Sequence, residues 1–212
     1  NVAFVPRTKV GRDVEFAALC RDFGFHAVVL ANGAWRDRPL PIEGADAWVG
    51  RGLVYQNPFI IWFNHENEKG FTGVRFEPVD DAIVVGGGLA SIDVAKVLML
   101  ETTRAKLRDR GIEEPMIDLE VKGIPKVLER HGLVFEDLGL TGCTLFYRRR
   151  IEDMTALPDE VTGAMAEGAE IEALMAPVRI EADEDGCAAA LWVQPQIIGE
   201  ADKSGRPRPN KA

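Results

Sequence analysis

Short runs of apolar residues alternate with polar and glycine-rich stretches along the chain, and the lengths of these runs predict strands. Continuous apolar runs at residues 26–31, 81–85 and 143–147 are typical of strands buried in a parallel sheet. Asn32-Gly33 closes the first run and Gly86-Gly87-Gly88 closes the second. Because glycine in such a position marks a turn, the second strand is expected to end in a tight turn.

Helical periodicity fills the segments between the predicted strands. The longest helical pattern begins near Leu89, directly after the glycines, and continues to about Arg110. Residues 111–141 follow as a helical insertion that prolines and glycines divide into short pieces. Shorter helices are expected at 15–22, 55–68 and 158–167.

The last part of the chain changes to a pattern typical of antiparallel strands. Residues 170–181 and 187–198 are predicted to be strands that pair around the turn at 183–186. The predicted fold is therefore α/β, a Rossmann-like doubly wound parallel sheet with a helical insertion and a C-terminal β-hairpin or meander.

The composition limits the partners that this fold can have. Of the 212 residues, 34 are acidic and 25 are basic, and the net charge of −9 argues against a nucleic-acid-binding domain. No apolar run reaches the roughly 18 residues of a membrane-spanning helix, and no charged leader precedes an apolar segment. Cys20, Cys143 and Cys187 are far apart in the sequence, so neither a redox pair nor a cysteine metal site is predicted. These features favour the reducing cytoplasm.

The turn after the second predicted strand carries the first functional motif. Residues 86–91 match the pattern G-x-G-x-x-small between a strand and a helix, the setting in which this pattern binds dinucleotides. Gly86 permits a tight turn, Gly88 lets the backbone approach a pyrophosphate, and the small Ser91 allows close packing of helix on strand. The N–H groups of the first helical turn would then face the phosphates. The candidate pyrophosphate-binding residues are Gly86, Gly87, Gly88, Leu89, Ala90 and Ser91.

Three consecutive arginines follow the third predicted strand, where a dinucleotide-binding fold faces the adenosine ribose. An acid at this point binds the 2′-hydroxyl of NAD, whereas arginine accommodates the 2′-phosphate of NADP. Arg148, Arg149 and Arg150 therefore favour NADP(H) as the cofactor. The alternative is a solvated charge run that pairs with Glu152 and Asp153.

The spacing of the two motifs adds a condition to this interpretation. Gly88 and Arg148 lie 60 residues apart, whereas about 20 residues usually separate the glycine motif from the ribose contact. The excess is attributed to the insertion at 111–141. The arginine assignment therefore requires this insertion to loop out without disturbing the strand order.

With these motifs, the sequence resembles the small (β) subunit of NADPH-dependent glutamate synthase and related flavoprotein reductases, including adrenodoxin-reductase-like enzymes. Residues 28–35 are similar to the A-T-G segment through which such chains leave a flavin domain, so Asn32 and Gly33 join the candidate cofactor-binding residues. Asn32 stands where threonine is usual, and the insertion is longer than in the glutamate synthase subunit, which indicates a sister group. The other matching segments are residues 83–88 with Asp93, residues 147–149 with Met154, and Gly205-Arg206 with Pro209.

The resemblance implies a discontinuous layout, in which a pyridine-nucleotide domain is inserted into a flavin domain. Residues 1–45 would be the end of the first flavin-domain segment and the crossover, and residues 46–212 the NAD(P)H-binding domain. NADPH would pass hydride to FAD and electrons would leave to an acceptor protein or subunit, so no catalytic side chain is predicted. The flavin-binding glycine motif would precede Asn1, and this fragment by itself would be inactive.

Two other functions fit parts of the same pattern. A non-catalytic module that binds a nucleotide as a regulatory or structural ligand needs the same glycine turn. A methyltransferase that binds S-adenosylmethionine has a similar turn, but an acid is expected where Arg148 to Arg150 stand. Glycines by themselves also form plain flexible turns, and the strand and helix around residues 86–91 are what favour nucleotide binding.

Overall fold

The computed structural model describes residues 2–203 and 205–212, and the chain divides into two compact units, Asn1–Trp35 and Arg36–Ala212. The first unit contains one helix of six residues, α1 (Phe16–Arg21), which confirms the predicted helix at 15–22. An isolated bridge between Val10 and Val14 precedes it. Apart from that bridge, the described part of this unit contains no strand pairing.

The predicted strand at residues 26–31 is wrong. These residues have no regular hydrogen-bonded structure, and Val29 and Leu30 are 88% and 71% exposed. A strand requires a neighbour for its backbone N–H and C=O groups. The described residues of the first unit offer no strand that pairs with this run, so the apolar sequence stays extended and unpaired.

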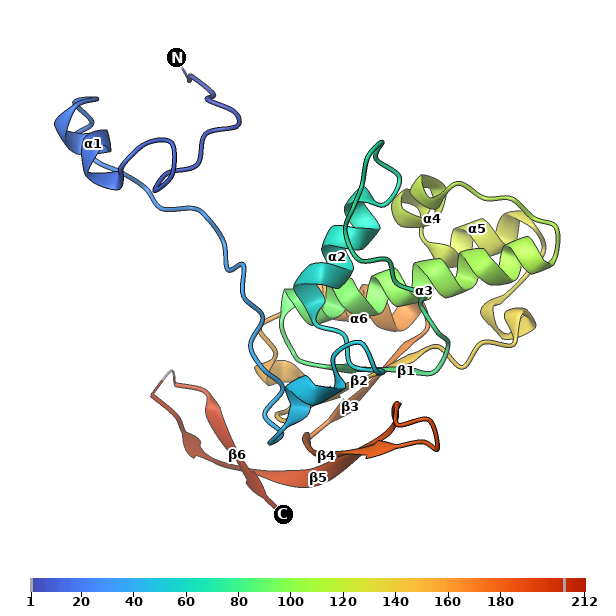
Figure 1. The fold of residues 1–212 in the computed structure, drawn as a ribbon. Coiled ribbons are helices and arrows are strands. Elements are labelled where there is room, and N and C mark those ends of the chain that lie inside the picture. Colours follow the sequence, from blue (N-terminus) through green and yellow to red (C-terminus); the bar gives the residue numbers. More distant parts are fainter. Residues whose placement is uncertain (1, 204) are drawn as a thin grey trace. The chain divides into compact units, whose positions relative to one another are not determined.

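The second unit is built around a parallel sheet of three strands. The strands β1 (Ala82–Val85), β2 (Cys143–Tyr147) and β3 (Ala169–Ala173) lie side by side in the order β1-β2-β3. Helices α3 (Leu89–Asp109) and α6 (Pro158–Ala166) connect them. This βαβαβ arrangement is one half of the Rossmann fold. The structure thus confirms the predicted α/β fold and the predicted strands at 81–85 and 143–147 (Figure 1).

Helix α3 forms the centre of the hydrophobic core. It contacts all three strands and also packs against α6 and against α2 (Gln56–His65), which confirms the helix predicted at 55–68. Ala95 of α3, Leu145 of β2 and Leu107 of α3 have no exposed surface. Phe59 and Trp62 of α2 belong to the same buried cluster. Among the described residues, no helix is long and apolar enough to cross a membrane.

The predicted helical insertion consists of three short elements between α3 and β2. Two seven-residue helices, α4 (Met116–Lys122) and α5 (Ile124–Arg130), are followed by the 3-10 helix η2 (Phe135–Leu138). Figure 1 shows α4 and α5 near the end of α3. The register still pairs Ala82 directly with Cys143, so the insertion loops out and leaves the strand order intact, as the arginine assignment required.

The chain leaves the parallel sheet at Leu174, a non-glycine residue with φ of +59°. After this kink, β4 (Met175–Ala182), β5 (Ala188–Ala201) and β6 (Pro207–Lys211) form an antiparallel sheet in that order. The predicted hairpin around 183–186 is confirmed. The single strand predicted at 170–181 is instead two strands in two sheets, because the kink at Leu174 divides it.

Candidate nucleotide-binding site

The glycine turn joins β1 to α3 at the carboxyl edge, by which we mean the end of the parallel sheet where its strands finish. The N–H of Gly86 donates to the carbonyl of Phe146 at 3.1 Å and so extends the β1–β2 ladder by one residue. Gly88 is the N-cap residue of α3. The Oγ of Ser91 accepts from the N–H of Gly88 at 3.1 Å and donates to the carbonyl of Gly88 at 2.6 Å. Ser91 therefore caps the helix as well as packing closely.

Close packing explains why the first two glycines stand in this turn. A Cβ at Gly87 would lie 2.3 Å from Cε2 of Tyr147, and a Cβ at Gly86 would lie 2.8 Å from the Cβ of Ser91. At Gly88 the nearest atom would be the Oγ1 of Thr155, at 3.3 Å. The ring of Tyr147 thus leaves no room for a side chain at Gly87, while a Cβ at Gly88 would meet only one atom, the hydroxyl oxygen of Thr155, in a tight contact.

Backbone donors are available at this turn. The N–H groups of Gly87, Leu89 and Ala90 have no acceptor among the described residues. Leu89 and Ala90 are exposed at the start of α3, a helix of 21 residues. Unpaired N–H groups and the positive end of the helix dipole together attract anions such as phosphate. The turn therefore has the chemistry that a pyrophosphate requires.

The segment after β2 folds back onto the glycine turn. It contains the 3-10 helix η3 (Ile151–Asp153). The hydroxyl of Tyr147 donates to the carbonyl of Asp153 at 2.9 Å, and the N–H of Thr155 donates to the carbonyl of Gly87 at 2.9 Å. The two motifs that the sequence separates by 60 residues thus meet at the same edge of the sheet.

The three arginines of this segment have different surroundings. Arg148 is exposed, and its guanidinium makes no hydrogen bond or ion pair with any described residue. Arg150 makes a two-pronged contact with Asp153, with Nε–Oδ2 at 2.8 Å and Nη2–Oδ1 at 3.1 Å, and pairs with Glu152. The hydrogen bond from Arg150 holds the pKa of Asp153 below its ordinary value. The alternative interpretation, pairing with neighbouring acids, therefore describes Arg150.

Arg149 is buried, with 6% of its surface exposed. Its Nε donates to the carbonyl of Pro207 at 2.8 Å, and its Nη2 lies 2.8 Å from Oδ2 of Asp202. The side chain that was expected to meet a 2′-phosphate beside Arg148 is thus occupied by contacts with the connection between β5 and β6. Arg149 follows β2 as the sequence predicts, but its guanidinium contacts Asp202 and Pro207.

Asn32 and Gly33 belong to the Asn1–Trp35 unit, whereas every other candidate residue belongs to the Arg36–Ala212 unit. The Nδ2 of Asn32 donates to the carbonyl of Gly33, and the indole N–H of Trp35 donates to the carbonyl of Asn32. Gly33 has a φ of +68°. The role of Asn32 and Gly33 in cofactor binding stays a prediction.

Sequence reasoning missed Tyr147 and Thr155, the two residues that hold the arginine segment against the glycine turn. It also missed the difference between Arg148 and Arg149. The signal for this difference was present, because burial in β2 alternates and Cys143, Leu145 and Tyr147 are buried. Continuing the period of two past the strand end places Arg149 with the buried residues and Arg148 with the exposed ones.

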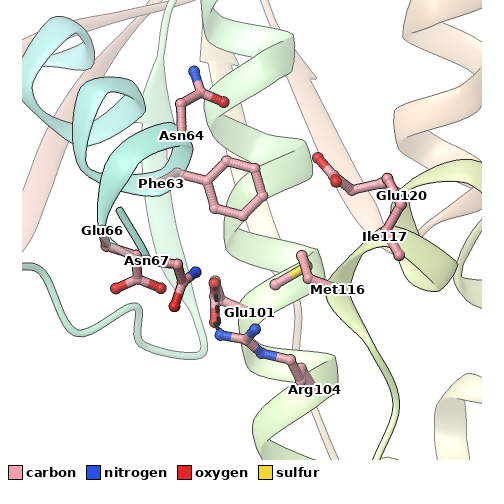
Figure 2. A pocket seen from close by; sticks show the side chains of 9 residues that line it. All are labelled: Phe63, Asn64, Glu66, Asn67, Glu101, Arg104, Met116, Ile117 and Glu120. Carbon is pink, nitrogen blue, oxygen red and sulfur yellow. Dashed lines mark hydrogen bonds and ion pairs between the residues drawn. The ribbon is translucent and has the colours of Figure 1, made fainter. Parts of the chain in front are cut away.

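A separate hollow of about 270 Å³ lies between α2, α3 and α4 and contains none of the candidate residues. Figure 2 shows the side chains of Glu101 and Arg104 of α3 paired at its wall. The Nη2 of Arg104 lies 3.0 and 2.7 Å from the two carboxylate oxygens of Glu101. Burial raises the pKa of Glu101, although the charge of Arg104 opposes this effect. This pair is part of the helical layer and not of the nucleotide site.

No model of a protein family matches the chain. The chain is 28% identical over 209 residues to the NADPH-Fe(3+) oxidoreductase subunit beta of Geobacter sulfurreducens, and the match covers 99% of this chain and 24% of that subunit. It is 31% identical over 107 residues to the mitochondrial NADPH:adrenodoxin oxidoreductase of Arabidopsis thaliana, which covers 50% of this chain and 21% of the relative. These relatives are NADPH oxidoreductases. The chain spans about a quarter of their length.

Two solved structures have a fold similar to that of this chain. FprA from Mycobacterium tuberculosis superposes with a TM-score of 0.55 at 19% identity, over 96% of this chain and 50% of FprA. A second structure, FprA in complex with NADPH, has a TM-score of 0.53 at 16% identity. At this identity the likeness shows the fold, which is the Rossmann-like fold that the strand order indicates.

Proposed function

We propose that this chain is the NADP(H)-binding part of an FAD-dependent oxidoreductase that resembles the glutamate synthase small subunit. In the whole protein, this part would hold NADPH for hydride transfer to FAD, from which electrons would pass to an acceptor protein or subunit. The observation that carries the proposal is the placement of Arg148, an exposed and unpaired guanidinium beside a glycine turn with open N–H donors. Two relatives are named as oxidoreductases that use NADPH with Fe(3+) or adrenodoxin, and these names support the same class of reaction.

The phosphate groups of the nucleotide have matching groups at the carboxyl edge. The N–H groups of Gly87, Leu89 and Ala90 bind the pyrophosphate, and the lack of a side chain at Gly88 lets the backbone approach it. Arg148 binds the 2′-phosphate with a guanidinium that stays charged and offers two parallel donors. When bound, NADPH supplies the hydride, and the residues of this chain bind and orient it.

The proposed flavin part involves the first residues of the chain. Residues 1–45 are proposed as the end of a flavin-domain segment and the crossover, and residues 46–212 as the NAD(P)H-binding domain. The exposed apolar run at 26–31, with Val29 and Leu30 open to solvent, supports this layout because such a run is suited to a sheet of a neighbouring domain. Flavin absorbance in the longer protein, bleached by NADPH without oxygen, is the expected result. A longer protein that holds no flavin would contradict this part of the proposal.

Calorimetric titration with NADPH and NADH tests the role of Arg148. The chain is expected to bind NADPH more tightly than NADH, and Arg148→Ala is expected to weaken NADPH by about 10- to 100-fold, the loss of a charge-assisted contact worth about 1.5–3 kcal/mol. Binding of NADH should not change. Arg38→Ala removes another exposed arginine and serves as the control. Equal affinity for the two nucleotides, equal losses for both, or no binding of either would overturn the proposal.

A further inference from the structure

We propose that Arg149 is a positioning residue, which with Asp202 fixes the segment that presents Arg148 and does not itself bind the 2′-phosphate. This inference rests on the proposed function, because it concerns how the same NADP(H) site is held. It assigns different roles to two adjacent arginines that a sequence motif treats as equivalent.

The contacts of Arg149 connect three elements. Its backbone carbonyl accepts from the N–H of Leu174 at 3.0 Å, which ties it to the kink between β3 and β4. Its guanidinium reaches the carbonyl of Pro207 in β6 and the carboxylate of Asp202, both at 2.8 Å. Backbone and side chain together therefore hold the first residues after β2 against the kink that leads into the antiparallel sheet and against the last connection of that same sheet.

Asp202 supplies the negative charge that a buried guanidinium needs. The Asp202 side chain is 22% exposed and that of Arg149 is 7% exposed, so the pair lies mostly out of water. Removing Asp202 would leave the guanidinium of Arg149 buried without its negatively charged partner. A 2′-phosphate that recruited Arg149 would have to break this pair and the contact with Pro207. Arg148 offers a charged group that requires no such rearrangement.

The alternation of side chains explains how one arginine can position the other. Residues 148 and 149 follow β2 directly, and the alternation of burial along β2 holds across them, with Arg148 exposed and Arg149 buried. Anchoring Arg149 on the buried side fixes the backbone from which Arg148 extends on the exposed side. Two backbone hydrogen bonds of Asp202 support this anchor, because its carbonyl accepts from the N–H of Gly205 at 2.9 Å and its N–H donates to the carbonyl of Arg206 at 2.7 Å.

Calorimetry of the Arg149→Ala and Asp202→Ala variants tests the inference. It measures the affinity of each variant for NADPH and for NADH. Both variants are expected to weaken the binding of NADPH by a similar factor of about three to ten and to leave the binding of NADH unchanged. The reason is that Arg148, when its backbone is held less firmly, loses part of its contact with the phosphate. In an Arg148→Ala background, neither variant should weaken NADPH further. Lys203 is exposed and follows Asp202 in the sequence, so Lys203→Ala is the matched control and should bind both nucleotides as the unmodified chain does.

Three results would overturn the inference. If Arg149→Ala weakens NADPH while Asp202→Ala leaves it unchanged or tightens it, then Arg149 binds the phosphate and Asp202 competes for it. If neither variant changes the preference for NADPH, the pair is scaffolding. If both nucleotides weaken equally, the pair supports the whole site and not Arg148. Where Arg149→Ala does not fold, Asp202→Asn keeps the shape, removes the charge and gives the same comparison. A failure of the unmodified chain to prefer NADPH would instead defeat the proposed function.

Discussion

The two edges of the parallel sheet are built from the same strands, but they differ in whether their polar groups have hydrogen-bond partners. At the amino edge, where β1 and β2 begin, the carboxylate of Asp80 accepts the N–H groups of Thr141 and Gly142 at 2.9 and 2.8 Å. The carbonyl of Gly142 in turn accepts the N–H of Asp81 at 2.8 Å. At the carboxyl edge, the donors of the glycine turn and the guanidinium of Arg148 have no partner among the described residues.

The polar groups of the amino edge stabilise the fold, whereas those of the carboxyl edge are available to a ligand. The amino edge is closed by its own carboxylate, so the 31 residues of the predicted insertion at 111–141 can be added there without altering the register. Lengthening a loop whose ends stay fixed costs little free energy. The carboxyl edge keeps donors open, which a folded protein tolerates at a surface where water or a ligand can satisfy them. Substitutions at the amino edge should therefore affect stability alone, whereas substitutions at the carboxyl edge should also affect nucleotide binding.

The largest expected loss of stability comes from Gly142→Ala at the amino edge. Gly142 has a φ of +96°, and a Cβ there would lie 2.4 Å from the carbonyl oxygen of Gly168. Backbone strain and a clash with backbone together should lower the free energy of unfolding by about 3 kcal/mol. Urea denaturation monitored by circular dichroism measures it. Gly139→Ala, with a φ of +64° but open space, is the control and should lose about 1 kcal/mol. Equal losses would mean that the clash is relieved.

At the carboxyl edge, Gly87→Ala should both destabilise the chain and block the nucleotide. A Cβ at this position would lie 2.3 Å from the ring of Tyr147, so the ring or the turn must move. Such overpacking costs about 1–3 kcal/mol. The displaced turn should also lose NADPH affinity, which calorimetry measures. Gly88→Ala would place a Cβ 3.3 Å from a single side-chain atom, the Oγ1 of Thr155, and should lose less stability than Gly87→Ala. A Gly87→Ala variant that binds NADPH normally would contradict the proposed place of the pyrophosphate.

Asp80→Asn should weaken the amino edge by a smaller amount and leave nucleotide binding unchanged. Burial opposes ionisation of Asp80, but the backbone N–H donors outweigh it and hold the pKa of the carboxyl below its ordinary value. The contribution of the carboxylate is therefore present above the unfolded pKa of about 3.9 and is lost as the pH falls through the lower folded pKa. The loss at neutral pH is expected to be about 1 kcal/mol. Urea denaturation at several pH values should show the difference shrinking below about pH 4; a constant difference would argue against the carboxylate.

Much of this organisation was predictable because local pattern and packing agree. The strands at 81–85 and 143–147 and the helix from Leu89 follow their hydrophobic periodicity, since each buries its apolar side in one core. The run at 26–31 has an equally good strand pattern and forms none, because a strand depends on partners that a sequence pattern cannot supply. β6 (Pro207–Lys211) went unpredicted for the opposite reason: its residues are polar and include prolines, and pairing with β5 decides its structure.

The candidate site divides in the same way. The glycine turn and its place between strand and helix follow from local spacing, which the sequence records directly. The contacts of Arg149 with Asp202 and Pro207 join residues more than 50 positions apart, and nothing in the local pattern names those partners. Tyr147 was likewise placed in its strand, but its contact with Gly87 depends on the register between β1 and β2. Long-range pairing is therefore what sequence reasoning lacked.

The smallest effect on stability is expected from Arg148→Ala, although its effect on NADPH is among the largest. Arg148 makes no hydrogen bond or ion pair with any described residue, so its removal should change the free energy of unfolding by less than about 0.5 kcal/mol. Arg149→Ala provides the contrast, because it leaves Asp202 without its buried partner and should destabilise the chain measurably. Urea denaturation of the two variants side by side makes this comparison. If Arg148→Ala destabilised the chain as much as Arg149→Ala, then Arg148 would serve the fold, and the open carboxyl edge would lose the charge that we propose it offers to NADPH.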